Sequence, residues 1–103
     1  MDEAPYERDQ AVYKRFIDSY LAKKTDVEGY IQTFMDRWKQ DRDRESERPW
    51  LNPTPEASRF GRLTDRLFTS CDCYRPVPAG PIEISEETLR LELTLFRYIW
   101  WGL

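Results

Sequence analysis

The residues in this sequence that could take part in catalysis are few, and their spacing favours none of the common reaction types. The chain has no histidine, so it lacks the side chain used most often as a general base and as a metal ligand. On a helix, the side chains of its two cysteines, Cys71 and Cys73, would point about 200° apart. A redox pair would need the helix to unwind, so Cys71 is more simply a small buried side chain.

Two pairs of neighbouring carboxylates, Glu86 with Glu87 and Asp41 with Asp43, resemble the pairs used in acid–base catalysis. They lie at predicted helix ends among many other charges, without an apolar pocket that would raise a pKa. The four glycines are scattered and form no phosphate-binding loop. The sequence therefore predicts a protein that is not an enzyme and that needs no metal or other cofactor.

A short basic strip, Arg59, Arg62 and Arg66, has the spacing to contact phosphate groups from one helix face. Asp65 interrupts the strip, and a net charge of -3 gives the chain no overall affinity for nucleic acid. We expect these arginines to pair with the acidic second helix. Direct nucleic-acid binding is therefore not predicted.

Apolar residues recur at helical spacing in four segments, which predicts helices over residues 7–22, 26–43, 57–74 and 86–101. A capping box from Thr25 to Glu28 precedes the second, and Ser85 is a good N-cap for the fourth. Prolines separate the later helices, and the short link at 22–25 makes the first two neighbours antiparallel. The 103 residues form one domain, and the expected fold is an all-α, antiparallel four-helix up-down bundle.

The fourth predicted helix is apolar nearly all round, because Leu91, Leu95, Tyr98 and Ile99 lie off its main stripe. Such a helix is either central in the core or in contact with something else, and we favour the central position. We expect a monomer, with self-association through this C-terminal aromatic helix left open. No apolar segment is long enough to span a membrane and no signal sequence is visible, so the expected compartment is the cytoplasm.

One end of the predicted bundle is acidic, because an up-down order places the first link and the last crossover together. Three bases, Lys23, Lys24 and Arg75, lie there against six acids. The acids are Asp26, Glu28, Asp72, Glu83, Glu86 and Glu87. Such an end would attract a basic partner, although helix capping alone accounts for three of the carboxylates. The alternating charges of residues 41–48 are either a solvated helix end or a second recognition edge, which would include Asp41 and Asp43.

Three segments, at residues 38–43, 67–78 and 84–90, resemble the colicin D immunity-type family of small bacterial proteins. They contain a Trp-x-x-Asp-x-Asp helix end, an Asp-x-Tyr-x-Pro-x-Pro helix stop and an acidic helix start. The resemblance covers roughly residues 13–100. It implies a four-helix bundle that binds the nuclease domain of a cognate ribonuclease toxin that cleaves transfer RNA. Acidic residues of the bundle would then cover the basic active site of the toxin where RNA phosphates would sit.

On this interpretation the six acids of the end, together with Asp41 and Asp43, are the predicted toxin-binding residues. A non-catalytic helical adaptor or oligomerisation module is the alternative. We expect Trp50, which lies among three prolines, to be tucked over an end of the bundle and not to serve as an exposed contact anchor.

Overall fold

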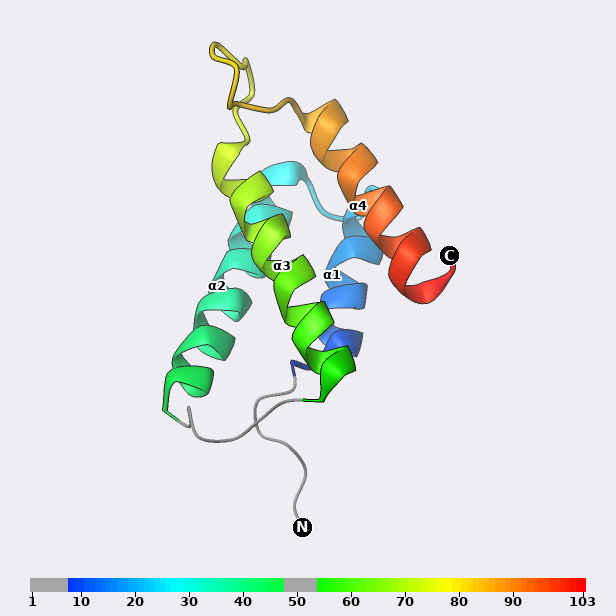
Figure 1. Cartoon of the computed structure of the whole chain (residues 1–103). Helices are drawn as coiled ribbons and strands as arrows, with labels where there is room; N and C mark the ends of the chain where they lie inside the picture. Colours follow the sequence, from blue (N-terminus) through cyan, green and yellow to red (C-terminus); the bar gives the residue numbers. More distant parts are fainter. Residues whose placement is uncertain (1–7, 48–53) are drawn as a thin grey trace.

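The computed structural model describes residues 8–47 and 54–103, which contain four α-helices (Figure 1). These are α1 (Gln10–Leu21), α2 (Val27–Ser46), α3 (Pro55–Cys73) and α4 (Glu86–Trp101). Within these residues the only β-type pairing is an isolated bridge between Tyr74 and Ile84. The predicted all-α fold class is confirmed. Trp50 lies outside the described residues.

Each helix begins at a side chain that accepts a hydrogen bond from a backbone N–H of its first turn. These N-caps are Asp9, Asp26, Thr54 and Ser85. The prediction of Thr25 as the cap of α2 was wrong, because Asp26 accepts the Gly29 N–H at 2.8 Å. Such caps satisfy donors that have no partner inside the helix.

The bounds of the first three helices differ from those predicted, whereas α4 has the predicted bounds. We expected the third helix to begin at residue 57, but it begins at Pro55, because proline fits the first helical position, where no N–H is needed. The second continues past residue 43 to Ser46. The first helix is shorter than the predicted 7–22, since Asp9 is its cap and Ala22 follows its last residue.

The core is formed largely by aromatic side chains from all four helices. Tyr13 packs edge-on against Phe34 and Phe60, with ring centroids 5.6 and 5.8 Å apart. Tyr30 stacks between Tyr20 and Phe34. Helix α1 contacts α2 and α4, and α3 contacts the same two helices, so the four surround this core. Side-chain contacts of this size supply most of the stability of such a bundle.

The two ends of α1 are each fixed to the opposite end of α4. Tyr20, near the end of α1, donates its hydroxyl to Glu86 at the start of α4. The Trp100 indole, near the end of α4, donates to Gln10 at the start of α1. The two helices therefore run in opposite directions. Figure 1 shows the α1–α2 link and the α3–α4 crossover in the upper part of the molecule.

Helix α4 is not central, so the position favoured from its composition was wrong. It packs on α1 and α3 through Leu89, Leu93 and Phe96, whereas Leu91 and Tyr98 are exposed.

The basic strip on α3 was also mispredicted. Within the described residues, none of its three arginines forms an ion pair with an acid of α2. None of the described helices is both long and apolar enough to cross a membrane.

Candidate functional site

The acidic end contains an open hollow of about 590 Å³ between the end of α1 and the starts of α2 and α4. Three of the predicted acids, Asp26, Glu86 and Glu87, line it. Its other lining residues are Tyr20, Lys23, Thr25, Val27 and Arg90. The hollow thus brings together acids that lie 60 residues apart in the sequence.

Glu86 is held in place by the floor of this hollow. The buried Tyr20 donates its hydroxyl to Glu86 Oε2 over 2.7 Å. Burial, and then this hydrogen bond, raise the pKa of Tyr20, so the phenol stays a donor at neutral pH. Arg90 lies over the Tyr20 ring and donates to the carbonyls of Tyr20 and Leu21, which closes the end of α1. A rigid base therefore supports this carboxylate.

Glu28 and Glu87 are exposed acids in the first turns of α2 and α4. Within the described residues neither carboxylate has a hydrogen bond or an ion pair. Both complement the positive end of their helix, which stabilises each by about 0.3–1 kcal/mol. That interaction leaves the carboxylate oxygens open to a partner.

Asp72 and Tyr74 extend the acidic end beyond the hollow. Burial raises the pKa of Tyr74, and the nearby carboxylates of Glu28 and Glu86 raise it further. Asp72 is exposed in the last turn of α3, where the helix dipole disfavours a negative charge. Its carboxylate accepts no hydrogen bond from the described residues, so no contact within them accounts for an acid at this position.

Glu83 is engaged by the crossover instead. Its Oε1 accepts the Ala79 N–H at 2.8 Å, and its Oε2 lies 3.8 Å from Arg75 Nε. Two backbone hydrogen bonds also join the start and the end of the crossover: the Arg75 N–H donates to the Ile84 carbonyl, and the Ile84 N–H donates to the Cys73 carbonyl. Glu83 therefore shapes this loop and offers less free carboxylate than Glu28 or Glu87.

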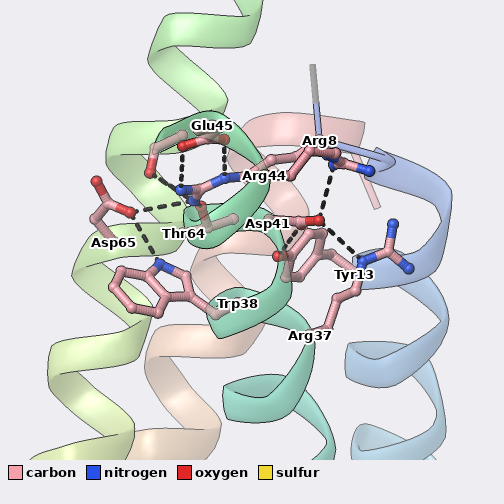
Figure 2. A network of polar contacts seen from close by, with 10 residues as sticks. Arg8, Tyr13, Arg37, Trp38, Asp41, Arg44, Glu45, Thr64 and Asp65 are labelled. Atoms are coloured by element: carbon pink, nitrogen blue, oxygen red, sulfur yellow. Dashed lines mark hydrogen bonds and ion pairs between the residues drawn. The ribbon is translucent and has the colours of Figure 1, made fainter. Parts of the chain in front are cut away.

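Asp41 has a different place from the one predicted, because its side chain is only 1% exposed (Figure 2). It accepts hydrogen bonds from the Tyr13 hydroxyl at 2.5 Å, from Arg37 at 3.2 Å and from Arg44 at 2.9 Å. A carboxylate enclosed in this way cannot form part of a contact surface, so we remove Asp41 from the candidate toxin-binding residues. Asp43 is exposed and pairs with Arg42, its neighbour in sequence.

A second polar network beside Asp41 was not found from the sequence. The buried Arg8 guanidinium contacts Glu45, Asp65 and the Thr64 hydroxyl. The Trp38 indole donates to the same Asp65 at 2.9 Å, as Figure 2 shows. The network ties the chain before α1 to α2 and α3. Its participants are far apart in sequence, and no local motif marks them.

A family model described as bacterial self-protective colicin-like immunity matches residues 10–94. The chain belongs to this family. No curated protein and no solved structure gives a significant match to it. The matched residues include all four helix starts and every member of the acidic end.

The cysteines of this immunity protein are both free. Cys71 is buried, and burial together with the carboxylates of Glu92 and Asp72 raises the pKa of its thiol to about 12. Cys73 is partly exposed. Within the described ranges no cluster of three or more ligating side chains could hold a metal ion.

Proposed function

We propose that this immunity protein inhibits a cognate nuclease toxin of the colicin D type by covering its basic active site with the acidic end. The observation that carries the proposal is the hollow in which Asp26, Glu86 and Glu87 meet, with Glu28 in the first turn of α2 next to the lining residue Val27. A ribonuclease must bind phosphates with basic side chains, and fixed carboxylates are complementary to such a surface.

The acids of this end have three roles in the proposal. Glu28, Glu87 and Asp72 contact the toxin directly, because they are exposed and no described side chain binds them. Glu86 contributes its charge from a fixed position on Tyr20, and Asp26 does so while capping α2. Glu83 acts mainly through the shape of the crossover. A prearranged set of charges loses little entropy on binding and speeds association.

The proposal takes the helices to follow one another in antiparallel up-down order, which gathers the starts of α2 and α4 and the end of α3. The opposed directions of α1 and α4 support that order. The protein would work without catalysis, and its place would be the cytoplasm, where transfer RNA is exposed to the toxin. The alternative, a helical adaptor, predicts no dependence on these carboxylates.

The test is inhibition of the nuclease domain of the cognate toxin, whose gene we expect directly beside this one, measured by transfer-RNA cleavage across a salt series. The variant carries Glu28→Lys, Asp72→Lys and Glu87→Lys, which disrupt no contact among the described residues. We expect it to fold and to lose inhibition, and the unchanged protein to associate more slowly as salt increases. Two of the reversals oppose a helix dipole at about 0.3–1 kcal/mol each, whereas the change at Asp72 favours one.

The matched control reverses three exposed acids near the end of α2 and the start of α3: Asp43→Lys, Glu47→Lys and Glu56→Lys. It has the same net charge as the first variant, and we expect it to inhibit. Equal loss in both variants would mean that net charge decides inhibition. Loss in the control alone would place the toxin at the opposite end and refute the proposal.

A further inference from the structure

Four large apolar side chains form a row along the outer face of α4. Leu91, Leu95, Tyr98 and Ile99 are 59%, 50%, 66% and 70% exposed. Leu95 and Ile99 also line a groove of about 330 Å³ against α3. Exposed apolar groups so close together are unusual on a monomer and typically mark a binding surface. The acidic end does not account for this row.

The two ends of the row carry opposite charges. Glu87 lies at the start of α4, and the exposed Arg59 and Arg62 lie on α3. Phe60 contacts Trp100, with ring centroids 5.2 Å apart, so these arginines are level with the far end of α4. The surface is therefore acidic at the start of α4 and basic at its far end, and Glu92 and Arg66 line the groove beside Leu95 between the two ends.

We infer that a second copy of this chain covers the row, with the two α4 helices antiparallel about a two-fold axis near Leu95. A two-fold axis places the same patch of both copies in contact and exchanges its ends. Glu87 of each copy then faces the basic end, at Arg59 and Arg62, of the other. The charge pattern of the surface is thus complementary to itself.

This pattern favours a second copy over an anionic membrane. A membrane would attract the arginines and the apolar row, but it would repel Glu87 and Glu92 along the same face. A single helix face is small compared with the interfaces of permanent dimers. We therefore expect an equilibrium between monomer and dimer that depends on concentration.

Sedimentation equilibrium of the full chain tests the apolar row. The average mass should rise with concentration from that of one chain, 12.4 kDa, toward twice that value. Leu91→Glu with Tyr98→Glu should abolish the rise without unfolding the helices, because both side chains are exposed. The control is Val77→Glu with Ile82→Glu, two crossover residues that are 81% and 75% exposed. A constant monomer mass, or equal loss in the control, would overturn the inference.

Exchanged charges test the orientation of the two copies. Arg62→Glu and Glu87→Lys should each weaken self-association, because each places like charges across the two-fold axis. Mixing the two variants should restore a dimer, since each reversed charge then meets its opposite. A mixture that stays monomeric would overturn the antiparallel arrangement.

Vesicles of phosphatidylcholine and phosphatidylglycerol distinguish the membrane alternative. We expect no sedimentation of the chain with them. Sedimentation that is lost in the Leu91→Glu, Tyr98→Glu variant, without any dimer in solution, would assign the row to a lipid surface. None of these measurements involves the toxin. A result that overturns the dimer therefore does not affect the proposed inhibition, and loss of the proposed inhibition does not affect the dimer.

Discussion

Replacing Asp41 should damage the stability of the bundle and leave toxin inhibition by the folded protein unchanged. The carboxylate accepts hydrogen bonds from one fully buried donor, the Tyr13 hydroxyl, and from two partly exposed guanidinium groups. Removing one partner of a buried charged network costs about 3–5 kcal/mol. Water can reach Arg37 and Arg44, whose side chains are 24% and 43% exposed, so the loss for Asp41→Ala should be about 2–4 kcal/mol.

Two further variants separate the contributions to this loss. Asp41→Asn keeps an acceptor oxygen for the Tyr13 hydroxyl but turns an amide N–H donor toward Arg37 and Arg44, so we expect a loss of about 1–3 kcal/mol. Tyr13→Phe combined with Asp41→Ala should show a coupling energy of about 1–2 kcal/mol, because the two side chains share one short hydrogen bond. A domain of this size has about 5–15 kcal/mol of stability, so the variants should still fold.

The assay is urea unfolding followed by circular dichroism, together with toxin inhibition per folded molecule. Asp43→Ala is the control, and its exposed pair with Arg42 should contribute no more than about 1 kcal/mol. Unchanged stability of Asp41→Ala together with lost inhibition would refute the reasoning. It would return Asp41 to the toxin-binding surface.

Three other predictions concern the two cysteines and Asp18. At neutral pH a thiol reagent should modify the partly exposed Cys73 quickly, and should modify the buried Cys71 only as fast as the protein opens. Cys73→Ser should remove the fast phase of the reaction. Burial raises the pKa of the Cys71 thiol to about 12, so the folded state keeps this proton at a pH where the unfolded chain loses it. The free energy of unfolding should therefore fall as pH rises above about 9. In urea titrations at alkaline pH, Cys71→Ala should reduce this fall. Although partial burial by itself raises the pKa of Asp18, Lys14 and Arg97 hold it below its ordinary value, so Arg97→Met should move it upward in an NMR titration. No upward shift would contradict that assignment. The stability that Asp18 contributes should be present above its unfolded pKa and be lost as pH falls through the folded one.

The helices could be predicted because their signals are local. Ser85 and the glutamates that follow it predicted the start of α4 from neighbouring residues alone, and the spacing of apolar residues predicted its length. The position of α4 could not be found in the same way. Periodicity records which side chains are apolar, and it does not say that only α1 and α3 are available to cover them. Leu91 and Tyr98 therefore looked like core residues and are exposed.

The candidate site was partly predictable for the same reason. Glu28, Glu86 and Glu87 follow helix starts, so an expected order of helices was enough to bring them together. Asp41 was placed on the surface because it begins a run of alternating charges. Its burial depends on Tyr13, which is 28 residues away and belongs to another helix. A contact of this kind leaves no trace in the neighbouring sequence.

The pairing of α1 with α4 bears on when the protein becomes active during its synthesis. Tyr20, Asp18 and Gln10 of the first helix have their partners at Glu86, Arg97 and Trp100 of the last. While a ribosome is still translating α4, these partners are missing, Asp18 has only Lys14 of its own helix, and one side of the aromatic core is open. Glu86 and the tyrosine that holds it become partners only after the start of α4 has been synthesised. A nascent chain would therefore offer no protection, and a cell would depend on completed copies made before the toxin is encountered.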